Sequence, residues 1–112
     1  MAQTIKNIGV EVNIEVTGNT DTQLVCTRKD ADGNVVNITG YTYYATIYDA
    51  GWNEITTVSA TITTAASGLF KVLFDNDTNA TLSIDAEYQW DLYEDNGIIE
   101  TPLMYGKLTR KR

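Results

Sequence analysis

The sequence of 112 residues contains no histidine, one cysteine and one proline. Histidine is the commonest general base and the usual partner of a serine or cysteine nucleophile, so its absence argues against most catalytic arrangements. The single thiol, Cys26, can form neither an internal disulfide nor a zinc site of the usual composition. Its apolar neighbours predict a buried structural thiol. We therefore expect a protein that is not an enzyme and that holds no metal or cofactor.

Basic residues and long apolar segments are also scarce. Eight Lys and Arg stand against fifteen Asp and Glu, for a net charge of −7, whereas nucleic-acid binding requires clustered cations. No apolar run approaches the roughly 18 residues of a membrane span, and residues 1–6 lack the apolar core of a signal peptide. The composition predicts one globular domain over residues 1–112 that binds neither nucleic acid nor membrane.

The basic residues that are present gather at one end. Half of them are Lys107, Arg110, Lys111 and Arg112. Residues 1–106 contain the other four together with all fifteen acidic residues, which gives that part a charge of −11. We expect a short basic C-terminal tail that pairs with an acidic patch on a neighbouring copy, because opposite charges at two ends favour head-to-tail assembly. The alternative is a terminus that only aids solubility or frays.

Alternation of apolar and polar residues predicts strands. Between residues 8 and 16 every second residue is apolar, which places all the apolar side chains on one face of a strand. The members of this series are Ile8, Val10, Val12, Ile14 and Val16. Further strands are predicted over residues 24–27, 41–48, 55–62, 69–74, 88–93 and 98–108, separated by turn-forming residues at 30–34, 49–54, 65–68 and 95–97.

Seven or eight short strands with a turn about every ten residues predict an all-β fold, an antiparallel sandwich of immunoglobulin-like size. Trp90 belongs to the predicted core, and one short helical turn within residues 76–84 is anchored by Leu82 and Ile84. The Asp-Asn-Gly sequence at residues 95–97 predicts a type I′ hairpin turn. Pro102 predicts an edge or a bulge in the last strand.

Aspartate and asparagine side chains at alternate positions of residues 30–34 and 75–79 have the spacing of the first ligands in a calcium-binding loop. The two series are Asp30, Asp32 and Asn34, and Asp75, Asp77 and Asn79. Neither segment has the glycine and glutamate that such a loop requires at its sixth and twelfth positions. We therefore interpret both as turns in which carboxylates accept hydrogen bonds from nearby backbone amides. A carboxylate pair such as Asp91 with Glu94 is an enzymatic alternative that no other feature supports.

Three aromatic residues are candidates for an interaction surface. Tyr44 and Tyr48 lie on the strand face opposite the predicted core, where tyrosine is either solvated or part of a protein interface. Trp52 lies in a polar loop, where it either folds back to cap the sandwich or anchors a partner.

Four segments, in order, carry a resemblance to a known family. They are the run DGNVVNITGYTYYATI at residues 32–47, the turn and strand at 66–72, the strand and Asp-Asn-Gly turn at 88–97, and the closing strand at 105–108. Together they span the chain from about residue 8 to 109, and their order is more specific than any one of them. The sequence resembles a family of tailed-bacteriophage virion domains, and among these the N-terminal β-sandwich domain of phage baseplate upper proteins.

The resemblance implies a non-enzymatic part of a phage virion, assembled in the host cytoplasm and bound to other virion proteins and copies of itself. Tail, baseplate or fibre attachment is the first expectation. Baseplate upper proteins carry a long C-terminal extension that trimerises, whereas this sequence ends after the predicted sandwich, so a head-decoration protein that stabilises the capsid is an alternative. A glycan- or receptor-binding module is a second alternative, and it predicts an exposed aromatic shelf around Trp52.

Overall fold

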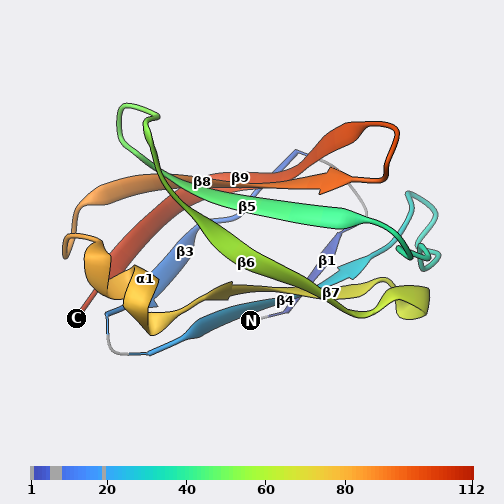
Figure 1. Cartoon of the computed structure of the whole chain (residues 1–112), viewed down its shortest axis with the longest axis horizontal. Helices are drawn as coiled ribbons and strands as arrows, with labels where there is room; N and C mark the ends of the chain where they lie inside the picture. The colour runs from blue at the N-terminus through green and yellow to red at the C-terminus, as the bar shows by residue number, and fades with distance from the viewer. Residues whose placement is uncertain (1, 6–8, 19) are drawn as a thin grey trace.

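The computed structural model describes residues 2–5, 9–18 and 20–112 (Figure 1). Within these ranges the chain forms nine strands, one 3₁₀ turn and one short helix. The strands are β1 (Ala2–Ile5), β2 (Val10–Glu11), β3 (Ile14–Thr17), β4 (Thr22–Arg28), β5 (Thr42–Asp49), β6 (Glu54–Thr64), β7 (Leu69–Phe74), β8 (Glu87–Asp95) and β9 (Glu100–Lys111). The 3₁₀ turn covers Ala65–Ser67, and helix α1 covers Asn76–Thr81. Across the described ranges, no helix is long and apolar enough to cross a lipid bilayer.

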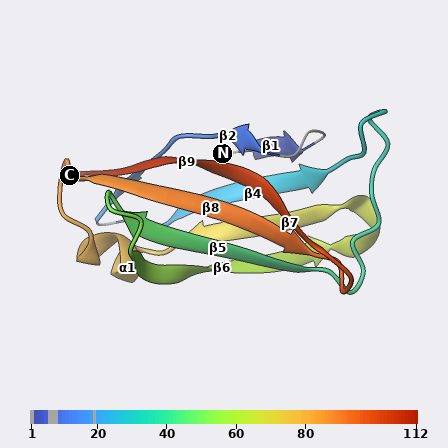
Figure 2. The same ribbon diagram turned by 90° about the horizontal axis from the view of Figure 1, so that it is seen from above.

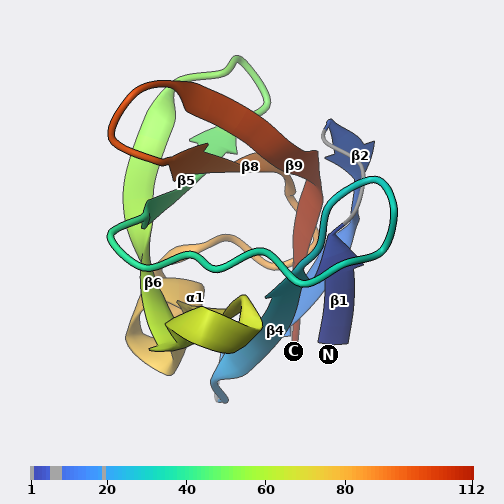
Figure 3. The ribbon, with the colours of Figure 1, turned by 90° about the vertical axis from the view of Figure 1, so that its right-hand side faces the viewer.

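Strand β6 joins the two layers of a sandwich. Its first part, residues 54–58, pairs with β5, and its second part, residues 59–64, pairs with β7. The strand order is β1-β4-β7-β6-β5-β8-β9-β2, with β3 also paired to β9. Viewed along the long axis, β1 and β4 face the layer of β5, β8 and β9, and β6 runs along the side that connects them (Figure 3). The predicted all-β sandwich is confirmed, with nine described strands in place of seven or eight.

The edge strands run in directions that the sequence pattern did not predict. β1 pairs parallel with β4, and both β2 and β3 pair parallel with β9, so the sheets are mixed rather than purely antiparallel. The single strand expected over residues 8–16 is interrupted at Val12 and Asn13, and Ile8 lies outside the described residues. Alternation specifies which face of a strand is apolar but carries no information about strand direction.

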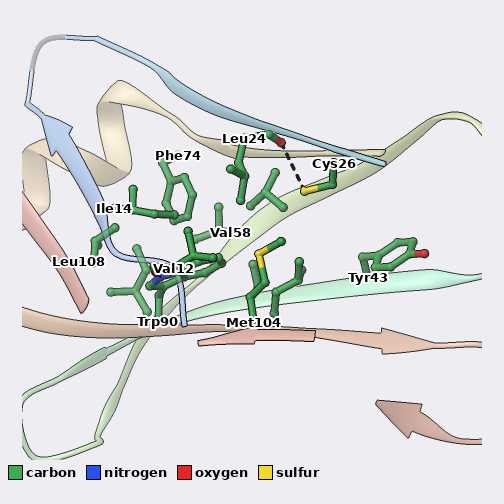
Figure 4. Packing of buried hydrophobic residues seen from close by; sticks show 14 of the residues in the cluster. Val12, Ile14, Leu24, Cys26, Tyr43, Val58, Phe74, Trp90, Met104 and Leu108 are labelled. Atoms are coloured by element: carbon green, nitrogen blue, oxygen red, sulfur yellow. Dashed lines mark hydrogen bonds between the residues drawn. The ribbon is translucent and has the colours of Figure 1, made fainter. Parts of the chain in front are cut away.

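Trp90 lies at the centre of the core, as predicted (Figure 4). Its ring meets Phe74 of the opposite layer edge-on, with 5.8 Å between ring centroids. Its indole Nε1 donates a hydrogen bond to the backbone oxygen of Val12 at 2.7 Å, which satisfies the one polar atom of a fully buried side chain. Further along the sandwich, Tyr43 and Phe70 stack face to face at 3.8 Å between centroids.

Gly106 lets the N-terminal segment lie directly against β9. A Cβ atom at this position would overlap the backbone carbonyl of Val12. On either side of that contact, Val12 N donates to Tyr105 O at 2.8 Å and Lys107 N donates to Asn13 Oδ1 at 3.0 Å. The break between β2 and β3 is therefore a hydrogen-bonded bulge that fits over a glycine.

The local predictions have mixed outcomes. The β8–β9 loop is four residues long, residues 96–99, and Gly97 is its residue with a positive φ, so the type I′ turn prediction is wrong. The bulge at Pro102 is confirmed, because the β8–β9 register shifts by one residue beside it. The short helix is confirmed as α1, with Leu82 buried beneath its end, whereas Ile84 is 43% exposed and its backbone forms an isolated bridge with Arg110.

Residues 30–34 form a turn held by its own carboxylate, as predicted, whereas residues 75–79 are the N-cap and first turn of helix α1. Asp30 Oδ1 accepts from the backbone amides of Asp32 and Asn34 at 3.0 and 2.9 Å. Asp75 Oδ1 caps α1 by accepting from Thr78 N at 2.7 Å, and that hydrogen bond holds the pKa of the Asp75 carboxyl below its ordinary value. In the part of the chain that the structure describes, no three His, Cys, Asp or Glu side chains gather as a metal site requires.

Cys26 predicts a pH dependence of stability. The thiol is fully buried on β4, and burial raises its pKa from 9.0 to about 12. Because the unfolded thiol ionises first, the contribution of Cys26 to stability is complete below pH 9 and is lost as pH rises toward 12, by about 1.4 kcal/mol per pH unit. Between pH 9.5 and 10.5, the unfolding free energy of Cys26→Ala should therefore fall by about 1 kcal/mol less than that of the wild type. Urea unfolding at each pH measures this, and parallel curves would contradict it.

Candidate protein interaction surface

The outward side of the β5–β8–β9 sheet carries a group of aromatic side chains. Alternate residues of these strands point into the core, so the intervening residues point out. The strand register then places Tyr44 directly opposite Tyr93, and Tyr105 opposite Asp91. We call this surface the aromatic face, and its members are Tyr44, Tyr48, Trp52, Tyr93 and Tyr105.

The aromatic face is open to solvent. Tyr44 and Tyr105 are each 46% exposed, and Trp52 is 56% exposed. Tyr44 and Tyr93 border a shallow hollow of about 210 Å³ together with Glu100. Large rings that combine apolar area with a polar hydroxyl or indole group are the side chains most enriched in protein interfaces.

Trp52 is displayed by a rigid loop rather than folded over the end of the sandwich. The Asp49 carboxylate accepts from the backbone amides of Gly51 and Asn53, both at 2.9 Å, and from the Asn53 side chain. These hydrogen bonds hold the pKa of the Asp49 carboxyl below its ordinary value, and the one from the backbone amide of Asn53 has the largest effect. Trp52 itself has a φ of 63°, which is uncommon for a bulky residue, and its ring lies 5.4 Å from that of Tyr48. Because Trp52 is 56% exposed, it does not cap the end of the sandwich, and its contact with a partner stays a prediction.

Asp91 lies in the middle of the aromatic face, between Thr46 and Tyr105 in the strand register. Burial raises the pKa of its carboxyl, and a hydrogen bond with Tyr48 offsets part of that rise. Its Oδ1 atom is buried and has no hydrogen-bond partner. Glu94 points to the opposite face of β8, into the core, so the carboxylate pair considered as an enzymatic alternative does not form.

Replacing Asp91 should stabilise the isolated protein. Since its pKa is raised, the folded state disfavours the charged form, a penalty present at pH 7 and absent below the ordinary pKa of 3.8. Asp91→Asn should raise the unfolding free energy at pH 7 and leave it nearly unchanged at pH 3. Urea unfolding at both pH values checks this, with the exposed Asp32→Asn as the matched variant that should change neither. A less stable Asp91→Asn protein at pH 7 would show that the carboxylate supports the fold.

The basic C-terminal residues belong to the sandwich. β9 continues to Lys111, so Lys107, Arg110 and Lys111 are strand residues rather than a tail, and Arg112 follows as an exposed terminal residue. One guanidinium nitrogen of Arg110 donates to the backbone oxygen of Leu82 at 2.6 Å. This hydrogen bond ties the end of β9 to the segment that follows α1.

The two lysines of this strand form ion pairs within the chain. Lys107 Nζ lies 3.8 Å from Glu87 Oε1, and Lys111 Nζ lies 3.0 Å from Asp85 Oδ1. Exposed pairs of this kind contribute little to stability. Contact of these cations with a neighbouring subunit stays a prediction.

A solved structure shares the fold of this chain. The N-terminal domain of phage TP901-1 ORF48 superposes with a TM-score of 0.54, covering 100% of both chains at 14% sequence identity. No family model matches the chain, and no curated protein matches its sequence. At this level of identity, the likeness establishes the fold and nothing further.

Tyr44, Tyr48 and Trp52 were predicted from the sequence as surface candidates, whereas Tyr93 and Tyr105 were not. Both missed residues had a usable signal, because each occupies an outward position of an alternating strand. What the sequence lacked was the register that places Tyr93 opposite Tyr44. The predicted and missed residues together make one surface on three adjacent strands and the loop between β5 and β6.

Proposed function

We propose that this protein is a non-enzymatic bacteriophage virion structural protein that attaches to neighbouring virion subunits through the aromatic face. The observation that carries the proposal is that face, five aromatic residues on one side of the β5–β8–β9 layer. Two further findings support it: the fold shared with a domain of a phage protein over the full length of both chains, and the family resemblance of the sequence. Attachment in the tail, baseplate or fibre is the preferred position, and head decoration is the alternative.

The aromatic face has the composition of an interface centre. Tryptophan and tyrosine dominate the residues whose truncation weakens protein complexes most. The Asp49 hydrogen bonds hold the backbone on both sides of Trp52 in place before binding, so little backbone freedom is lost when a partner covers this loop. The buried Oδ1 atom of Asp91, which lacks a hydrogen-bond partner, also supports the proposal. Such an atom costs stability in the free protein, and it can accept a hydrogen bond from a partner once the surrounding side chains move.

Removal of two exposed rings should impair assembly without unfolding the protein. The double variant Trp52→Ala/Tyr44→Ala removes two side chains that lie outside the core, so its thermal unfolding should stay close to that of the wild type. Particles assembled with this variant should contain on the order of tenfold fewer copies, measured by mass spectrometry of purified virions. Val25→Ala, which truncates a 37% exposed side chain on the opposite layer, is the matched control. Undiminished incorporation of the double variant would refute the role of the aromatic face.

The exposed Trp52 ring beside Tyr48 also favours a second candidate, a glycan- or receptor-binding module. Sugar rings stack on exposed aromatic surfaces of this type. A glycan array separates the two functions: binding that is lost in Trp52→Ala while virion incorporation is unchanged supports recognition of a glycan. Incorporation that is lost with no glycan bound supports the structural role.

A further inference from the structure

The β8–β9 hairpin ends in an exposed apolar tip. Ile98 is 90% exposed and Ile99 is 59% exposed, the two largest values among the exposed large apolar side chains of the described residues. Neither residue belongs to the aromatic face. The hairpin projects at one end of the molecule, while the Trp52 loop and the C terminus lie at the other (Figures 1 and 2). We call Ile98 and Ile99 the isoleucine tip.

The loop that carries the tip is held by side-chain hydrogen bonds. Asn96 Oδ1 accepts from the backbone amides of Ile98 and Ile99 at 2.9 and 3.0 Å. Asp95 Oδ1 accepts from Gly97 N at 2.8 Å, and Gly97 has a φ of 92°, a conformation that glycine adopts without strain. The two isoleucines are therefore presented on an ordered loop, which lowers the entropic cost of docking them.

The surroundings of the tip are acidic. Asp95 at the end of β8 is paired directly with Glu100 at the start of β9. Glu100 also borders the hollow beside Tyr44 and Tyr93. The turn that contains Asp30 and Asp32 lies in the connection between β4 and β5, at the same end of the molecule (Figure 1). An apolar projection with an acidic rim is complementary to an apolar pocket with a basic rim.

We propose that the isoleucine tip inserts into an apolar pocket with a lysine- or arginine-rich rim on a different protein. A second copy of this chain is a poor fit, since three hollows on its described surface each contain a carboxylate: Glu100, Asp77 and Glu15. Lys107 beside Glu15 only balances that charge. An anionic membrane surface would repel the acidic rim. This inference concerns a second surface and does not depend on the proposed virion role.

Nuclear magnetic resonance on the full chain tests the proposal. The probe is an amphipathic peptide of leucine and lysine, compared with the same peptide carrying glutamate in place of lysine. The lysine peptide should shift the amide signals of residues 97–100 with at least tenfold higher affinity than the glutamate peptide. The variant Ile98→Ser/Ile99→Ser should abolish these shifts, and Glu100→Lys should weaken them. Val35→Ser, which removes a 49% exposed side chain next to the other acidic turn, should leave them unchanged.

Three results would overturn the proposal. Absence of shifts at residues 97–100, or equal shifts with both peptides, would show that the isoleucine tip does not recognise an apolar pocket with a basic rim. A dimer in sedimentation velocity that disappears in Ile98→Ser/Ile99→Ser would make a second copy the partner. Shifts at the tip with zwitterionic lipid vesicles in place of the lysine peptide would make a bilayer the target.

Discussion

Replacement of Gly106 by alanine should destabilise the protein by about 3 to 4 kcal/mol, a large effect for one methyl group. The new Cβ would overlap the carbonyl of Val12, lying 2.7 Å from its carbon atom, and the obstacle is backbone rather than a flexible side chain. Relief of the overlap requires the N-terminal segment to move away from β9. That movement breaks the hydrogen bonds from Val12 N to Tyr105 O and from Trp90 Nε1 to Val12 O.

Urea unfolding of Gly106→Ala gives the size of this effect. Gly51→Ala is the matched control, because its added Cβ would meet only side-chain atoms at 3.3 Å or more. We expect that control to change the unfolding free energy by less than about 0.5 kcal/mol. A decrease of less than about 1 kcal/mol in the unfolding free energy of Gly106→Ala would mean that the N-terminal segment at Val12 is not tightly packed against β9.

Glu94→Ala should cost about 3 to 5 kcal/mol. The Glu94 side chain is buried on the inward face of β8, near the end of the strand. Its Oε2 accepts hydrogen bonds from Arg28 Nε and from the Tyr43 hydroxyl, both at 2.9 Å. Truncation removes the carboxylate that faces the Arg28 cation and leaves the buried Tyr43 hydroxyl without its acceptor. Loss of one partner from a buried ion pair is costly because the remaining charge is poorly solvated.

The exposed ion pair of β8 and β9 provides the control for Glu94. Glu87 and Lys107 have side chains that are 58% and 63% exposed, so Glu87→Ala should cost less than about 1 kcal/mol. Glu94→Gln, which keeps an acceptor for the Tyr43 hydroxyl but removes the charge, should fall between the two. Equal thermal unfolding midpoints for Glu94→Ala and Glu87→Ala would contradict a structural role for the buried pair.

The sequence predicted those parts of the fold that depend on local patterning. Alternation placed Trp90 in the core and Tyr44 on the outer face, and the apolar neighbours of Cys26 indicated a buried thiol. Composition placed a turn at residues 30–34. The parallel pairing of the N-terminal strands with β4 and β9 was not predictable in this way, because it depends on contacts between distant segments. The overlap that Gly106 avoids is visible only when Val12 is placed against β9.

The interaction surface was predictable only in part, for a related reason. Each tyrosine of the aromatic face can be assigned to an outward position from its own strand, but their grouping depends on the register between strands. The isoleucine tip was not predicted, because Ile98 was counted as the beginning of the last strand, whereas β9 begins at Glu100. The strand β9 also continues to Lys111, further than predicted, so most of the residues predicted as a basic tail are paired with β3.

The central claim is that the aromatic face attaches this protein to a neighbouring subunit of a phage particle. Single-particle electron microscopy of the intact virion tests it most directly, since it locates the chain and shows what covers each side of the sandwich. We expect density for this chain in the particle, and we expect the side chains of Trp52 and Tyr44 to be buried against a neighbouring protein. Particles that lack the chain, or that contain it with the aromatic face open to solvent, would contradict the claim.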